Sequence, residues 1–146
     1  MPAPYADRAA SGMLAPMEAD FTDPGRGPLA LGIDFGTIYS SAAAVVDERV
    51  EYVLDGGERA IPSVVHYPPA GAPLVGRSAL ARAAADPTRT VSSIKRILGR
   101  GFDEPEVRRL DAGVGYRLER GPRGAPVVVL DDRQLAPPQV VAEVLG

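Results

Sequence analysis

The sequence predicts a mixed α/β fold, and three observations support this prediction. Residues 29–54 contain three short apolar stretches separated by turn residues, which is the pattern of consecutive β-strands. Residues 78–107 are rich in helix-forming residues and leave isoleucine and leucine on single helical faces. Residues 114–145 return to strand-like runs and end in a short amphipathic helix. A chain of 146 residues is long enough for one folded domain.

The predicted strands fall into an N-terminal and a C-terminal group. The N-terminal group is a meander of three strands followed by two short extended segments, at Ala30–Asp34, Ser40–Val46, Arg49–Leu54, 61–65 and 73–76. The C-terminal group comprises Gly115–Glu119, Pro126–Leu130 and Arg133–Leu135. The first strand is a continuous apolar run bounded by turn signals, so we expect it to be buried.

Two helices are expected between these groups. The first covers Ser78–Asp86, which is rich in alanine, and it is stopped by Pro87. The second covers Val91–Leu98, with Thr90 as its N-cap and Gly99 directly after its end.

Two further helices follow. One starts at Asp103, where Glu106 completes an Asp-x-x-Glu capping box and Pro105 lies in the first turn. The other opens at Pro137. Ala136 stands at its N-cap position without a hydroxyl, which weakens the cap by about 1 kcal/mol.

The composition excludes several classes of protein. The formal net charge is −3, so the sequence predicts no broad basic surface for nucleic acid. Cysteine is absent and His66 is the single histidine, which excludes a disulfide scaffold, a thiolate metal site and a multi-histidine metal centre. No stretch approaches the roughly 18 apolar residues of a membrane helix, and no secretory signal is recognised. We therefore expect a cytoplasmic protein without membrane contact.

Residues 1–28 are predicted to be a disordered tail, because proline and glycine punctuate them and no periodicity persists.

The candidate binding site follows the first predicted strand. Asp34 places a carboxylate at the rim of a sheet, and Gly36 allows a bulky ligand to approach the backbone. The amides of Gly36, Thr37, Ile38 and Tyr39 are then in position to contact a phosphate. A carboxylate beside a phosphate normally addresses a divalent metal, for magnesium usually through water. The simpler alternative is a buried strand with a surface aspartate in a turn.

Residues 33–40 read Ile-Asp-Phe-Gly-Thr-Ile-Tyr-Ser. This stretch resembles the first phosphate-binding signature of the heat shock protein 70 (Hsp70) chaperones of the actin-like ATPase superfamily, and further blocks follow in the order of that family. The segments 61–65 and 74–76 resemble its Thr-Pro-Ser and Val-Gly steps. Residues 93–107 are similar to the stretch that carries the catalytic lysine, and 135–145 to a helix that leads back to the core.

The resemblance implies an ATPase whose nucleotide lies in a cleft between two lobes. Residues 29–146 would be the N-terminal part of the nucleotide-binding domain, which is a partial actin-like, ribonuclease H-like lobe with a mixed sheet and a small peripheral α/β subdomain. Asp34 would hold Mg²⁺ through water. The backbone amides of 36–39 and the Thr37 hydroxyl would contact the phosphates of ATP. Lys95 would be the catalytic residue that positions the γ-phosphate and the attacking water. Without the resemblance, Lys95 is interpreted as a solvated helix lysine.

The resemblance also implies partners. A full-length protein of this family would couple ATP binding and hydrolysis to the folding of unfolded polypeptides in the stress response, with a J-domain co-chaperone and a nucleotide-exchange factor. This chain departs from the family at Ile38, where a second hydroxyl is usual. The family's second phosphate loop, its adenosine-binding residues and its second lobe are not found in the sequence. We therefore expect the isolated chain to be inactive as an ATPase.

Other functions remain open from the sequence. The chain is also consistent with a non-enzymatic interaction module or decoy that binds co-chaperones. Another member of the actin-like superfamily, such as a sugar kinase or a filament-forming protein, would share the Asp-x-Gly-Thr hairpin. A ribonuclease H-type nuclease would use the first-strand aspartate for a catalytic metal, but it needs further carboxylates that the sequence does not nominate.

Overall fold

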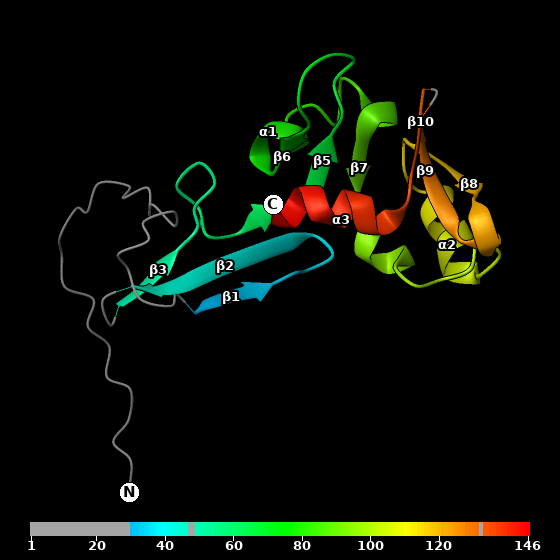
Figure 1. Ribbon diagram of the computed structural model, residues 1–146. Coiled ribbons are helices and arrows are strands. Elements are labelled where there is room, and N and C mark those ends of the chain that lie inside the picture. The colour runs from blue at the N-terminus through cyan, green and yellow to red at the C-terminus, as the bar shows by residue number, and fades with distance from the viewer. Residues whose placement is uncertain (1–29, 47–48, 132) are drawn as a thin grey trace, which may run out of the picture.

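The computed structural model describes residues 30–46, 49–131 and 133–146. Over these residues the fold is mixed α/β, with three small antiparallel sheets and short helices packed around them (Figure 1). The predicted tail at 1–28 lies outside the described residues. None of the helices in the described ranges is long and apolar enough to cross a membrane.

The first sheet is the predicted meander. It contains β1 (Leu31–Asp34), β2 (Tyr39–Val46) and β3 (Arg49–Tyr52), in that order, and β2 also pairs with the short β4 (Ile61–Pro62). Asp34 lies opposite Ser41, and Ile33 lies opposite Ala42. Because side chains alternate along a strand, Asp34 and Ile33 point to opposite faces of this sheet. The prediction that β1 is buried is wrong, since all four of its residues are exposed.

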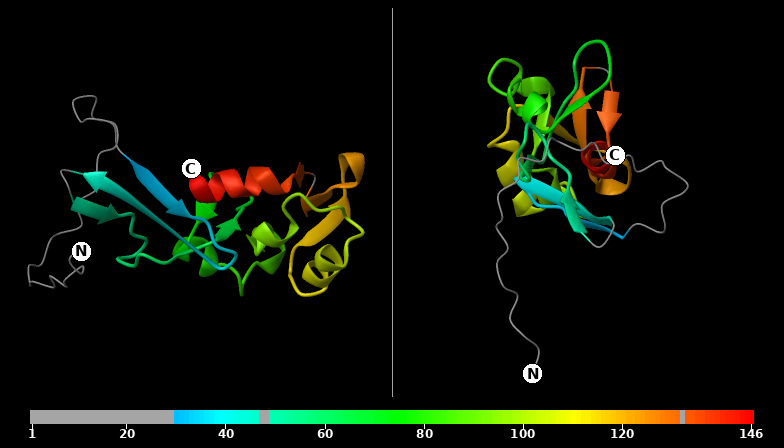
Figure 2. Two further views of the ribbon diagram at one scale, coloured as in Figure 1. Left: turned by 90° about the horizontal axis from the view of Figure 1, so that it is seen from below. Right: turned by 90° about the vertical axis from the view of Figure 1, so that its left-hand side faces the viewer.

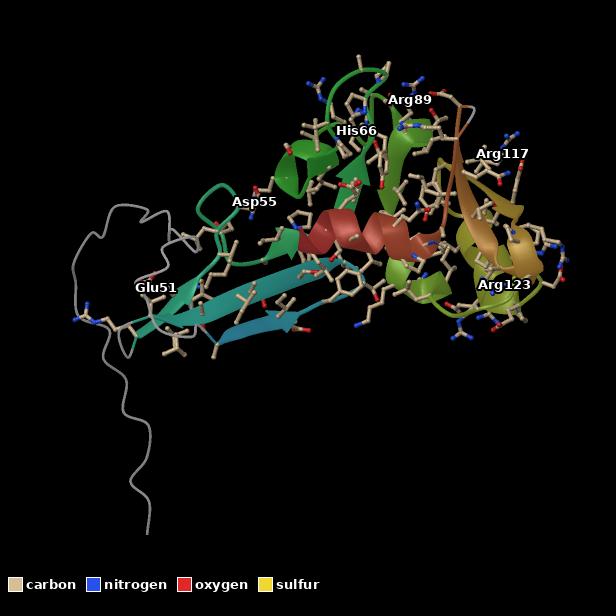
Figure 3. The ribbon with its side chains drawn as sticks, viewed as in Figure 1. Glu51, Asp55, His66, Arg89, Arg117 and Arg123 are labelled. Carbon is tan, nitrogen blue, oxygen red and sulfur yellow. The ribbon has the colours of Figure 1, made fainter. Side chains whose placement is uncertain are left out.

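The second sheet places β5 (Val64–His66) between β6 (Leu74–Val75) and β7 (Thr90–Ser92). Helix α1 (Arg77–Leu80) packs against it. The loop before β4, which carries Asp55 (labelled in Figure 3), is tied to the start of this helix. The Asp55 carboxylate accepts a hydrogen bond from the Arg77 amide at 2.6 Å.

The third sheet has the order β10-β9-β8, from Arg133–Leu135, Pro126–Leu130 and Arg117–Arg120. The remaining elements are α2 (Pro105–Asp111), α3 (Pro137–Leu145) and the 3₁₀ helices η1 (Pro87–Arg89), η2 (Ile94–Ile97) and η3 (Pro122–Gly124). Figures 1 and 2 show α3 running from the third sheet past the second sheet toward the first.

Helix α3 lies across the main hydrophobic core. It packs against η2, β5 and β9, and its Val140 is completely buried. The core draws apolar side chains from the second and third sheets and from the helices between them: Val65, Tyr67, Val91, Ile94, Ile97, Val107, Leu110, Tyr116, Leu118, Val128, Leu130 and Val140. Ala136, at the N-cap position of α3, has no hydroxyl to accept a hydrogen bond. The start of the helix is still held by Gln139, whose side-chain oxygen accepts a hydrogen bond from the Ala136 amide at 2.7 Å.

The predicted helix Val91–Leu98 is wrong. Residues 90–92 form strand β7, in which Val91 pairs with Val65 of β5. Ser93 then takes a left-handed conformation with φ of 57°, and only the single 3₁₀ turn η2 follows. Thr90 is therefore not an N-cap. Strand pairing and burial of the β-branched residues prevail over the helical spacing of the isoleucines.

Two other helix predictions need correction. Only Arg77–Leu80 of the alanine-rich segment is α-helical, and the residues after it form turns. The predicted capping box at Asp103 does not form, because Glu104 occupies the N-cap position of α2. Hydrogen bonds and charge from Arg120, together with Arg108, instead hold the pKa of Asp103 below its usual value.

Two buried tyrosines give a stability prediction. The Tyr67 hydroxyl is buried without a hydrogen-bond partner among the described residues, whereas the Tyr116 hydroxyl donates to the Ser92 carbonyl at 2.6 Å. A buried unsatisfied polar group costs about 1–3 kcal/mol. We expect Tyr67→Phe to keep or raise the free energy of unfolding, and Tyr116→Phe to lower it by about 1 kcal/mol. Thermal melts of both variants check this, and an equal loss in the two would contradict it.

Candidate active site

The candidate site is the turn between β1 and β2. Asp34 ends β1 and Tyr39 begins β2, so the residues predicted to bind phosphate connect two antiparallel strands. Gly36 and Thr37 are partly buried, whereas Ile38 and Tyr39 are 67% and 54% exposed. The first half of the turn therefore packs against the rest of the protein, while its second half faces solvent.

Glycine is required at position 36 by a close approach within the turn. A Cβ atom placed on Gly36 would lie 2.0 Å from the carbonyl oxygen of Tyr39. Real Cβ atoms do not approach a backbone oxygen so closely, so any other residue would force the two ends of the turn apart. The sequence predicted that Gly36 leaves room for a ligand, and the structure adds that it leaves room for the chain itself.

Three carbonyls of the turn accept hydrogen bonds, whereas three of its amides have no partner among the described residues. The carbonyls of Phe35, Gly36 and Ile38 all accept hydrogen bonds, from Lys95 and, twice, from Ser63. The amides of Gly36, Thr37 and Ile38 donate no hydrogen bond to any residue that the structure describes. Successive unpaired amides of this kind are a typical anion-binding arrangement.

Lys95 reaches this turn from a distant part of the chain. It lies on η2, where Ile94 and Ile97 are buried and leave Lys95 exposed. Its ammonium nitrogen Nζ donates a hydrogen bond to the Phe35 carbonyl at 2.5 Å and lies 5.6 Å from the centre of the Phe35 ring. The structure thus brings Lys95 to the predicted phosphate turn, although the element that carries it is a 3₁₀ turn and not the expected helix.

Asp34 is exposed at the end of β1, next to this turn. Within the described ranges it forms no salt bridge, and no group of three or more metal-ligating side chains is found there. A solitary carboxylate does not make a complete protein site for a metal ion. It does fit Mg²⁺, which keeps several waters and takes further oxygens from substrate phosphates. The residues present therefore fit a magnesium–nucleotide complex better than a free metal ion.

Ser63 was not predicted as a site residue. It is 2% exposed, and its hydroxyl donates to the Gly36 carbonyl at 2.9 Å while its amide donates to the Ile38 carbonyl at 2.8 Å. The sequence showed only a short strand at 61–65 and its resemblance to a family segment. The available signal was a serine directly after Pro62 in an otherwise apolar run.

Comparisons with known proteins identify the family of this chain. The family model described as "Hsp70 protein" matches residues 30–146. The chain is 37% identical over 116 residues to "Chaperone protein DnaK" of Psychrobacter cryohalolentis, covering 79% of this chain and 18% of that protein. It is 38% identical over 130 residues to "Chaperone protein HscA homolog" of Azotobacter vinelandii, covering 84% and 21%. The chain spans about a fifth of the length of these curated relatives. It belongs to the Hsp70 family and covers part of the N-terminal, nucleotide-binding region of that family.

Proposed function

We propose that this chain supplies one side of the ATP site of an Hsp70-type chaperone. Its sheets would form part of an actin-like ATPase lobe, with the ribonuclease H-like meander of β1, β2 and β3 carrying the phosphate turn. The observation that carries the proposal is the β1–β2 turn, which carries amides that are unpaired among the described residues and accepts a hydrogen bond from the Lys95 ammonium group. Amides and a cation together are suited to bind the phosphates of a nucleotide.

Each site residue has a distinct role in this proposal. The amides of Gly36, Thr37, Ile38 and Tyr39 and the Thr37 hydroxyl contact phosphate oxygens. Asp34 would hold Mg²⁺ through one of its waters, and the bound ion would supply positive charge beside the phosphates.

Lys95 acts on the reacting group. Phosphoryl transfer depends on positioning and positive charge more than on covalent catalysis. The Lys95 ammonium lies at the turn through its bond to the Phe35 carbonyl, so a short rearrangement brings it to a γ-phosphate seated on the amides. There it would position the γ-phosphate and the attacking water.

The wider function is proposed from the relatives. The two relatives are named as chaperone proteins. We propose that a full-length protein containing this chain uses ATP binding and hydrolysis to bind and release unfolded polypeptides in the cytoplasm. A J-domain co-chaperone and a nucleotide-exchange factor would regulate that cycle. The isolated chain contributes only one side of the cleft, so we propose that it binds ATP weakly and does not hydrolyse it at a useful rate.

Binding of Mg·ATP to the 146-residue chain tests the proposal. Charge-assisted hydrogen bonds contribute roughly 1.5–3 kcal/mol each, while association costs about 4 kcal/mol or more, so a dissociation constant on the order of millimolar or weaker is expected. An NMR titration of ¹⁵N-labelled chain should shift the amide resonances of residues 36–39 first.

Asp34→Ala should remove the magnesium dependence of these shifts. Asp131→Ala is the matched control, because it breaks an ion pair between the turn that follows β9 and Arg89 of η1, away from the β1–β2 turn, and it should behave as the unmodified chain. Shifts that spread over the surface without involving the turn, or that persist unchanged in Asp34→Ala, would refute the assignment.

A further inference from the structure

Ser63 lies where the first and second sheets meet. It separates β4, which pairs with β2, from β5, the central strand of the second sheet. Its side chain is buried. A buried hydroxyl needs hydrogen-bond partners, whereas an apolar side chain in the same place would need none. All the hydrogen bonds that it donates end on the turn that precedes β2.

The hydroxyl groups of Ser63 and Ser40 form a chain with one direction. Ser63 uses its single proton to donate to the Gly36 carbonyl at 2.9 Å. The 2.8 Å contact between the two hydroxyl oxygens therefore has Ser40 as its donor. Ser40 is 8% exposed, so both hydroxyls are shielded from water that would otherwise replace these bonds.

These bonds fix the direction in which the turn's amides point. In a trans peptide, the carbonyl of one residue and the amide of the next lie in one plane and point in opposite directions. Because Ser63 holds the carbonyls of Gly36 and Ile38 toward itself, the amides of Thr37 and Tyr39 must point away from it. The donors are thereby presented on the side of the turn that Ser63 does not occupy.

Ser63 also sets the turn relative to Lys95. The residue after it, Val64, pairs with Ser92 of β7, three positions before Lys95. The Phe35 and Gly36 carbonyls are consecutive, and they accept from Lys95 and Ser63 respectively. The pairing of β5 with β7 thus fixes the positions of Ser63 and Lys95 relative to each other, and both donate to the same turn.

We propose that Ser63 is a positioning residue for the phosphate-binding turn, supported by Ser40. It orients the Thr37 and Tyr39 amides toward the phosphates and holds the turn in register with Lys95. This inference rests on the proposed nucleotide function of the turn. A purely structural Ser63 would instead affect the stability of the sheet junction without a specific effect on the turn amides.

Four variants separate these possibilities. Ser63→Ala removes the hydroxyl, Ser63→Thr retains it, and Ser40→Ala removes only the supporting donor. Ser78→Ala is the matched control, because the exposed Ser78 hydroxyl donates to the Val75 carbonyl at 2.8 Å and lies on α1, outside the turn. The ¹⁵N–¹H spectra of all variants are recorded first without nucleotide and then with about 5 mM Mg·ATP, a concentration near the expected dissociation constant.

Without nucleotide, Ser63→Ala should shift or broaden the Thr37 and Tyr39 amide resonances, while Ser78→Ala leaves them in place. With Mg·ATP, the response of these amides should fall roughly tenfold in Ser63→Ala, less in Ser40→Ala, and recover in Ser63→Thr. Unchanged Thr37 and Tyr39 resonances in nucleotide-free Ser63→Ala would overturn the inference.

The two proposals fail in different ways. If the turn of the unmodified chain does not respond to Mg·ATP, the nucleotide function fails, while the nucleotide-free spectra still decide whether Ser63 orients the amides. If Ser63→Ala does not fold, Ser40→Ala decides: unchanged turn resonances in that variant would overturn the positioning role.

Discussion

Replacing Gly36 by alanine is expected to abolish the binding of Mg·ATP at the β1–β2 turn. The added Cβ would lie 2.0 Å from the Tyr39 carbonyl oxygen and 3.2 Å from the Tyr39 carbonyl carbon. Both atoms belong to the backbone, so no side-chain rotation relieves the contact, and the turn has to open. Overpacking of this kind typically costs about 1–3 kcal/mol, and here the strain falls directly on the amides that would hold the phosphates.

Gly32→Ala is the matched control for this prediction. Gly32 lies on the same strand, β1, but the Cβ placed on it meets only the Ala43 carbonyl oxygen at 3.8 Å, an ordinary contact. The control should keep the turn resonances and their response to Mg·ATP, whereas Gly36→Ala should lose both and melt at a lower temperature. A Gly36→Ala chain that still binds Mg·ATP as well as the Gly32→Ala chain would show that the observed turn geometry is not the binding geometry.

Lys95→Ala is expected to abolish ATP hydrolysis in a complete nucleotide cleft. The suitable protein is a chimera in which residues 30–146 replace the matching part of a full-length DnaK relative. Removal of Lys95 takes the ammonium group from the turn where the γ-phosphate would lie. Loss of one preorganised charge in such a site lowers the rate on the order of 10²–10³-fold. Binding of ATP should be largely retained, because the amides and Asp34 remain.

Phosphate release and equilibrium nucleotide binding measure the two parts of this prediction. Arg96→Ala is the control, since Arg96 is the adjacent exposed cation on η2 and leaves the bond between Lys95 and Phe35 intact. Its hydrolysis rate should match that of the unmodified chimera. An equal loss of hydrolysis rate in the Lys95 and Arg96 variants would indicate a general effect of surface charge. Full activity in Lys95→Ala would show that Lys95 is not a catalytic residue.

Features determined by local sequence were predicted best. Strands β9 and β10 begin and end at the predicted residues, and α3 begins at the predicted Pro137. Each of these is marked by turn or proline residues at its boundary, and such signals act within a few residues. The β1–β2 hairpin was predicted for the same reason, since Gly36 and Thr37 interrupt two apolar runs.

Features determined by distant contacts were predicted less well. Residues 91–98 carry helical spacing, but the pairing of β7 with β5 imposes an extended conformation on the first part of this segment. The contact of Ser63 with the turn joins residues that are 27 positions apart in the chain, which no local pattern reveals. The place of Lys95 was predicted from the family resemblance and not from its local sequence, which by itself indicates a solvated helix lysine.

The span of the Lys95 contact bears on how this region folds. The bond from Lys95 to Phe35 closes a loop of 60 residues, and all three strands of the second sheet lie within that loop. Closing such a loop is entropically unfavourable until intervening structure shortens it. The β1–β2 hairpin can form from neighbouring residues, whereas we expect the lysine to reach it only after β5 and β7 have paired. In a nascent chain, the β1–β2 turn would therefore form before Lys95 contacts it. The affinity of the proposed site for nucleotide would then develop late in folding.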